Sequence, residues 1–317
     1  MKRGAGLARQ RRQRGAALLT AMIIVTLVAT LASSMIWQQW RAVQVETAER
    51  ARAQSAWILT GALDWARLIL REDARSGGAD HLGEPWAVPL AEARLSTFLA
   101  ADRDNAEDAP EAFLSGAIAD AQARYNLRNL IDQNKVLPAE LQVLERLCET
   151  AGVSSSVAAR IATGLLEASQ ADSESAEAPL MPHSVAELVW LDIDADTVQR
   201  LAPYVVLLPA RTPVNVNTAS REVLAAVIDD MDLASAERLV QVRQRTPFRG
   251  RADLNKLLPG GIQPPAGRLD IASRFFEITG RLRLEQRVLE ERSLVERKGL
   301  DIVPLRRERV NHQDTGT

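Results

Sequence analysis

Residues 16–40 form one continuous segment without a single ionisable side chain, and this segment constrains the fold more than any other part of the 317-residue chain. About 20 apolar residues in a helix cross the roughly 30 Å hydrocarbon core of a bilayer, so the segment is long enough to span a membrane. Residues 1–15 carry six Lys and Arg and no acid. Because basic residues favour the cytoplasmic side, residues 1–15 are predicted to be cytoplasmic and everything after Arg41 to lie across the membrane, with Trp37 and Trp40 at the interface.

A cleaved secretory signal is the main alternative, but its apolar core is usually only about 7–15 residues long. Here the apolar segment is longer and runs into residues 38–73, which contain no Pro and one Gly. This composition predicts one helix over residues 16–75, ended by Gly77 and Gly78. Its second half is expected to pack on a globular body through an apolar stripe formed by Trp57, Ile58, Leu63, Trp65, Leu68, Ile69 and Leu70.

The start of this helix resembles a type IV prepilin leader. RQRG at residues 12–15 precedes AALLT at residues 16–20, and the resemblance implies that a membrane peptidase cuts between Gly15 and Ala16 and that the new N-terminus is methylated. Most members of that class carry Glu at the fifth mature position, where this chain has Thr20. A carboxylate within the membrane is costly unless it is paired, so Thr20 suggests a subunit that does not dock on a neighbour through that contact.

The chain as a whole resembles the K-type minor pseudopilins of type II secretion systems, which also lack this Glu and are larger than their relatives. The motifs that carry the resemblance are QSAW at 54–57, DHLGEPW at 80–86, GAIADAQARYNLRNL at 116–130 and PVNVNTA at 213–219. The resemblance implies an α+β fold in which a long, type IV pilin-like N-terminal helix lies on an antiparallel sheet, with an inserted all-α domain of the helix-hairpin-helix or SAM-like kind. The implied domains are a leader (1–15), the transmembrane half of the helix (16–40), the first part of the pilin-like body (41–130), the inserted helical domain (131–255), the closing strands (256–310) and a disordered tail (311–317).

The same resemblance implies a structural, non-enzymatic subunit at the tip of the periplasmic pseudopilus, which initiates or caps its assembly for protein export. The implied partners are the other minor pseudopilins, the major pseudopilin, the prepilin peptidase and the bacterial inner membrane. The protein would cross that membrane once, with its N-terminus in the cytoplasm and its body in the periplasm.

Alternating patterns predict antiparallel strands at residues 275–284 and 286–297. A short edge strand is expected at 86–90, and a strand with its turn at 118–126. Residues 311–317 are expected to be frayed.

Residues 215–245 resemble a helix-hairpin-helix, with expected helices at 221–228 and 234–243. In DNA-binding proteins a Gly-containing hairpin of this kind places backbone N–H groups against a phosphate. The hairpin at 229–233 has no Gly and carries three carboxylates, which would repel phosphate, so no nucleic acid is expected. A DNA-uptake receptor that uses residues 213–254 stays the alternative function, and Asn217 or Thr218 is predicted to cap the helix.

Two acidic clusters carry alternating oxygen ligands of the kind that calcium takes. Asp192, Asp194 and Asp196 alternate just before a helical pattern, so helix capping explains them better. In the other cluster a solvated surface loop is the plainer explanation, but its alternating oxygen ligands leave calcium open; its members are Asp102, Asp104, Asn105, Glu107 and Asp108.

No catalytic or cofactor motif is present in the sequence. The three histidines lie far apart, and there is no Gly-x-Ser-x-Gly elbow or phosphate-binding Gly-x-x-x-x-Gly-Lys loop. The single cysteine, Cys148, is predicted to be a packed apolar residue. No cofactor is therefore expected, and a membrane-tethered enzyme is the third and weakest alternative.

Overall fold

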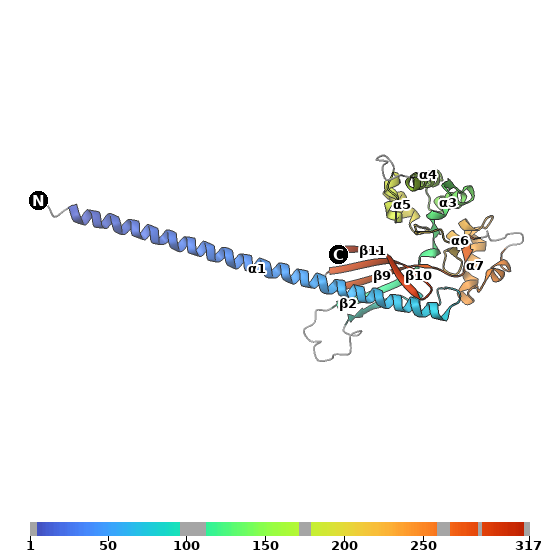
Figure 1. The fold of residues 1–317 in the computed structure, drawn as a ribbon, viewed down its shortest axis with the longest axis horizontal. Helices are drawn as coiled ribbons and strands as arrows, with labels where there is room; N and C mark the ends of the chain where they lie inside the picture. The colour runs from blue at the N-terminus through green and yellow to red at the C-terminus, as the bar shows by residue number, and fades with distance from the viewer. Residues whose placement is uncertain (1–4, 96–111, 171–178, 259–266, 285–286, 314–317) are drawn as a thin grey trace. The chain divides into compact units, whose positions relative to one another are not determined.

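The computed structural model describes residues 5–95, 112–170, 179–258, 267–284 and 287–313 (Figure 1). The acidic cluster between Asp102 and Asp108 lies outside these described residues. The chain divides into two compact units, residues 1–58 and 59–317, which are described separately.

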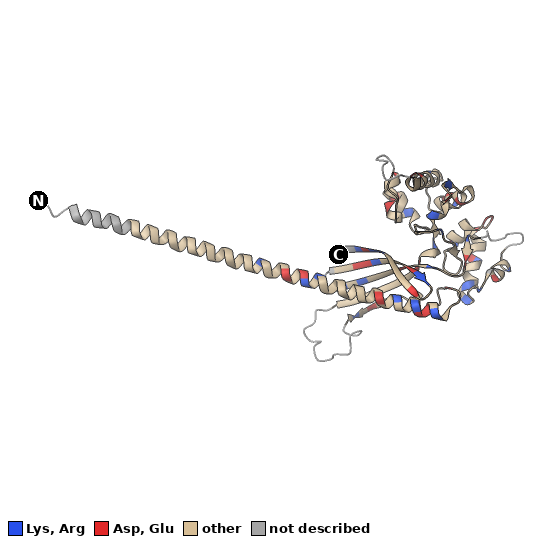
Figure 2. Ribbon diagram, in the orientation of Figure 1, with Lys and Arg blue, Asp and Glu red and all other residues tan. Residues whose placement is uncertain are grey.

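The first unit is the N-terminal part of helix α1, which runs from Ala5 to Ser76 and confirms the predicted long helix. From Ala16 to Trp40 this part of the helix has no charged residue, and Figure 2 shows the uncharged run as a continuous tan stretch. The large apolar side chains between Leu18 and Val45 are all more than half exposed. A helix with this length and composition can cross a membrane, where its exposed apolar side chains would contact lipid and not water.

The second unit is built on a five-stranded antiparallel sheet with strand order β1-β2-β9-β10-β11. The predicted strand pair at 275–284 and 286–297 is confirmed, and the expected strands at 86–90 and 118–126 are displaced. Residues 85–87 form a 3-10 turn before β1, and the strand expected at 118–126 instead runs from Ala112 to Asp120. The bounds are β1 Leu90–Arg94, β2 Ala112–Asp120, β9 Phe275–Leu284, β10 Arg287–Lys298 and β11 Asp301–Gln313.

Strand β11 is longer than expected. Its last residues pair with the start of β10, for example Asn311 with Leu289 and Gln313 with Arg287. The prediction that the tail is frayed from Asn311 is therefore wrong for residues 311–313, because the antiparallel ladder continues through them.

The C-terminal part of α1 packs on one face of this sheet. Leu63, Ala66 and Leu70 are buried there, and they pack against a cluster that includes Trp86 and Phe276. These helix positions follow the 3.6-residue period, which turns Trp65 and Leu68 away from the sheet. The predicted stripe was wrong for three of its members: Trp57 is 77% exposed, Leu68 59% and Trp65 50%.

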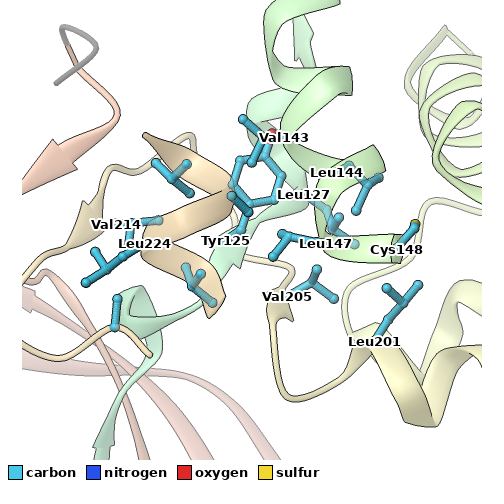
Figure 3. Close-up of a cluster of buried hydrophobic side chains, with 14 of the residues drawn as sticks. Tyr125, Leu127, Val143, Leu144, Leu147, Cys148, Leu201, Val205, Val214 and Leu224 are labelled. Carbon is cyan, nitrogen blue, oxygen red and sulfur yellow. The ribbon is translucent and has the colours of Figure 1, made fainter. Parts of the chain in front are cut away.

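A helical region follows β2 and ends just before β9, although these two strands are neighbours in the sheet. Its main helices are α3 Pro138–Thr150, α4 Ser156–Gln170, α5 Ala195–Leu201, α6 Arg221–Val227, α7 Leu233–Arg245 and α8 Arg251–Asn255. Short pairs β3–β6 (Tyr125–Asn126 with Val205–Val206) and β7–β8 (Val214–Asn215 with Leu269–Asp270) join distant parts of it. Its buried apolar core includes Tyr125, Leu144, Leu147, Leu201 and Leu224 (Figure 3). The helical region therefore has a core of its own and leaves and rejoins the sheet at adjacent strands.

Candidate functional sites: the stem and the buried polar junction

The stem, defined as residues 16–40 of α1, carries the predicted processing position. Gly15 and Ala16 are consecutive residues of α1, and Thr20 lies one helical turn after Ala16. The Thr20 hydroxyl donates a hydrogen bond of 2.9 Å to the carbonyl of Ala16. Since the helix itself satisfies this hydroxyl, position 20 presents neither a charge nor an unpaired donor to its surroundings.

At the end of β2, the fully buried carboxylate of Asp120 joins the sheet to the helical region. Its Oδ2 accepts hydrogen bonds from the hydroxyls of Thr218 and Ser273, both at 2.6 Å, and from Asn215 Nδ2 at 3.0 Å. Its Oδ1 accepts from the backbone N–H of Gln122 at 2.8 Å. Burial raises the pKa of Asp120, and these hydrogen bonds oppose the shift. We call this group of residues the polar junction.

Two asparagine side chains in the family motifs each donate a hydrogen bond to a backbone carbonyl and accept one from a backbone N–H. Asn126 accepts from the N–H of Leu208 at 3.1 Å, and its Nδ2 donates to the carbonyl of Ala210 at 2.7 Å. Asn129 makes the same reciprocal pair with the N–H and the carbonyl of Thr212. Buried polar groups that are this well paired hold a fold together and are not free for chemistry.

The predicted helix cap at Asn217 or Thr218 is wrong. Asn217 instead pairs with the backbone N–H and carbonyl of Phe248, and Thr218 belongs to the polar junction. Helix α6 is capped by Ser220, whose hydroxyl accepts from the N–H of Val223 at 3.3 Å. The cap lies later in the chain because the 217–219 segment is still held by the core.

A second cluster lies where α1 ends. The carboxylates of Asp73, Asp80 and Glu84 offer oxygens that all lie within 4.8 Å of one another. Arg297 donates to Asp73 at 2.8 Å and to Asp80 Oδ1 at 2.7 Å, so two of the three acids are already paired with a cation. Burial, with Glu84 and Asp80 nearby, raises the pKa of Asp73 to about 7.

The DHLGEPW motif, which supplies Asp80 and Glu84, lies beside this cluster. Trp86 is buried, and its indole N–H donates to Glu84 Oε2 at 2.7 Å. The same oxygen accepts from the backbone N–H of His81 at 2.8 Å. Sequence reasoning missed the contribution of Asp73 and Arg297 to this cluster, although the two acids in DHLGEPW were a signal that a cation had to lie near them.

The helix-hairpin-helix forms as predicted, but its hairpin is not arranged to bind phosphate. Asp229 is ion-paired with Arg146 at 2.9 Å and with Arg268 at 3.2 Å. Arg243 at the end of α7 is buried and donates to the carbonyl of Val216, and burial lowers its pKa to about 10. These basic side chains therefore support the fold and do not form a nucleic-acid surface.

Two further predictions are confirmed, the helix cap for Asp194 alone among the three aspartates and the packing of Cys148. Asp194 caps α5 by accepting from the N–H of Thr197 at 2.9 Å, which lowers its pKa. Cys148 is buried in the helical core, where burial raises the pKa of its thiol to about 11 and keeps it protonated.

An uncharged helical stem that continues into a helix packed on an antiparallel sheet defines a membrane-anchored protein with a pilin-like fold. The family described as "Type II secretion system (T2SS), protein K" matches residues 123–210 and 214–271. These matches support a minor pseudopilin of the K type of the type II secretion system, which confirms the resemblance seen in the sequence.

Relatives match most of the chain. It is 29% identical over 304 residues to the type II secretion system protein K of Pseudomonas aeruginosa, covering 88% of this chain and 87% of the relative. With the protein K of Pectobacterium carotovorum it shares 26% identity over 333 residues, covering 94% and 96%. The fold is similar to a chain in the crystal structure of the GspK-GspI-GspJ complex from the enterotoxigenic Escherichia coli type 2 secretion system, with a TM-score of 0.63, 22% identity and coverage of 83% and 98%.

Proposed function

We propose that the stem anchors this minor pseudopilin in the inner membrane, with residues 1–15 in the cytoplasm and the body in the periplasm. The basic leader before an uncharged helix supports this orientation. A peptidase then removes residues 1–15, and the amine of Ala16 becomes the methylated N-terminus.

The protein acts at the tip of the pseudopilus, where it starts or caps assembly. The observation that carries this proposal is Thr20, whose hydroxyl is satisfied within its own helix. A subunit at the tip has no subunit beyond it to supply an amine, so it needs no carboxylate at this position. Its partners are other minor pseudopilins and the major pseudopilin; the similar chain of known structure was solved in a complex with two other proteins of the type 2 system.

The role is structural and not catalytic. Asp120, Asn126, Asn129 and Asn217 are the polar residues that stand out in the recognised motifs, and all are engaged in buried hydrogen bonds that hold the body together. Bound calcium at residues 102–108 stays a prediction that depends on residues outside the described part of the chain.

The test is a Gly15→Leu variant in the native host, with Gly6→Leu in the same leader as the matched control. Mass spectrometry of the membrane-extracted protein should show the G15L chain at full length, while the G6L chain begins at a methylated Ala16. Secretion should fail in the first strain and persist in the second. Normal trimming and normal secretion with G15L would contradict the proposal.

The DNA-uptake alternative is tested with the full-length protein in detergent and duplex DNA. No complex should form at low salt. A shifted band that weakens as the salt concentration rises would support that alternative instead, because phosphate contacts weaken in salt.

A further inference from the structure

Arg41 is the first charged residue after the stem. Within the part of the chain that the structure describes, its guanidinium makes no hydrogen bond or ion pair, and it lies 5.7 Å from the ring centre of Trp37. The neighbouring positions one turn away on the helix are Trp37, Gln38, Gln44 and Val45, and none of them is an acid.

The arginines that follow on the same helix differ from Arg41. Arg50 pairs with Glu46 at 2.5 Å and Arg52 pairs with Glu49 at 2.8 Å. The first helical turn beyond the stem therefore presents a lone positive charge, whereas the next turns are locally neutral.

The rise of the helix predicts how deep residues 37–41 lie in the bilayer. From Ala16 to Trp37 the helix rises about 32 Å, which is close to the roughly 30 Å thickness of a hydrocarbon core. With Ala16 at one interface, Trp37, Trp40 and Arg41 reach the headgroup layer of the opposite leaflet. Both indole rings are about 60% exposed, as side chains that contact lipid must be.

We propose that residues 37–41 form a phospholipid-binding site, which rests on the membrane-anchored role proposed above. Arg41 binds the phosphodiester of an anionic lipid in the leaflet next to the body, because a guanidinium fork matches two phosphate oxygens. Trp37 and Trp40 hold the turn at the headgroup layer, where an amphipathic ring is most stable. Together they set the depth at which the anchor waits before it is drawn into the filament.

The first experiment measures lipid retention by the full-length protein, reconstituted in vesicles of phosphatidylethanolamine and phosphatidylglycerol and extracted in mild detergent. Mass spectrometry should show about fivefold less phosphatidylglycerol bound to Arg41→Gln than to the wild type, the effect of one basic residue near an anionic surface. Arg41→Lys should keep most of it. Arg52→Gln is the matched control and should retain as much lipid as the wild type, because Arg52 is already paired.

Equal retention by R41Q, or an equal loss in R52Q, would overturn the proposal. So would complete displacement of the lipid by inorganic phosphate, which would indicate a general anion site. None of these outcomes affects leader removal or secretion, so a failure here is distinguishable from a failure of the proposed function.

The second experiment measures depth by tryptophan fluorescence in vesicles with brominated lipids. Bromine near the headgroup should quench more strongly than bromine near the chain ends, and the extra quenching should vanish in a Trp37→Phe/Trp40→Phe variant. The four other tryptophans lie beyond residue 56 and serve as the unquenched background. Stronger quenching by the chain-end bromine would place the turn in the middle of the bilayer and refute the site.

Discussion

Replacing Asp120 by Ala should destabilise the body more than any surface charge change. The substitution removes the acceptor of four hydrogen-bond donors, but the four donors differ in whether another acceptor is within reach. Asn215 Nδ2 keeps the carbonyl of Asp80 at 3.1 Å, and the hydroxyls of Thr218 and Ser273 can turn to other acceptors. The backbone N–H of Gln122 is left buried without a partner.

One orphaned donor costs about 1–3 kcal/mol, and each lost bond to a charged group contributes about 1.5–3 kcal/mol before other partners are found. The carboxylate is fully buried and its pKa is raised, so its removal also relieves a desolvation cost. The net loss is expected to be about 2–4 kcal/mol for Asp120→Ala. Asp120→Asn should cost about half as much, because the amide oxygen can still accept from Gln122.

The assay is urea unfolding of the detergent-solubilised full-length chain, followed by tryptophan fluorescence. The matched control is Asp132→Ala, which removes an exposed ion pair with Arg211 and should change the free energy of unfolding by less than about 1 kcal/mol. If D120A is no less stable than D132A, the polar junction does not join the sheet to the helical region as argued.

Three other predictions concern different parts of the chain. Because the pKa of Asp73 is raised to about 7 in the folded state, its protonation stabilises the body fully below pH 3.8, and this stabilisation is lost as the pH rises through about 7. The melting temperature should therefore fall between pH 4 and 8, and Asp73→Asn should flatten this pH dependence. Gly116→Ala should lower the melting temperature, because its Cβ would lie 2.7 Å from the carbonyl oxygen of Thr279, whereas Gly61→Ala, with open space around it, should raise it slightly. Thr20→Glu should weaken membrane insertion and co-purification with the other pseudopilins, since an unpaired carboxylate costs up to roughly 3 kcal/mol in the bilayer; secretion equal to that of the wild type would show that a neighbour supplies an amine at this position.

Local patterns were enough to predict the long helix, the β9–β10 pair and the helix-hairpin-helix. Each depends on a period or a breaker that lies within a short stretch of sequence, such as the missing Pro in residues 38–73. The buried face of α1 was not predicted correctly, because Trp65 and Leu68 are as apolar as Leu63 and only the fold decides which of them meet the sheet. Strand β11 was not predicted as a separate strand; it is rich in charged residues and contains Pro304, both of which an edge strand of a sheet tolerates.

The contacts between distant residues could not be predicted at all. Asp73 and Arg297 are separated by 224 positions, and Asp120 and Ser273 by 153, so nothing local links them. The family motifs nevertheless pointed to the correct residues without revealing their partners. Asn215 and Asp120 lie in two separate motifs, and each is a hydrogen-bond partner of the other in a buried site, where an unpaired amide or carboxylate would be costly.

This placement bears on what the protein does. In an enzyme, polar residues that stand out in several separate motifs are expected to converge on an open cavity, where some groups stay free for the substrate. Here they converge on a sealed interior, and their hydrogen bonds link the strand that carries Asp120 with the helical region that carries Asn215 and Thr218. Because the sheet and the helical region are joined through the same buried carboxylate, these residues hold the body together, in agreement with the structural role proposed above.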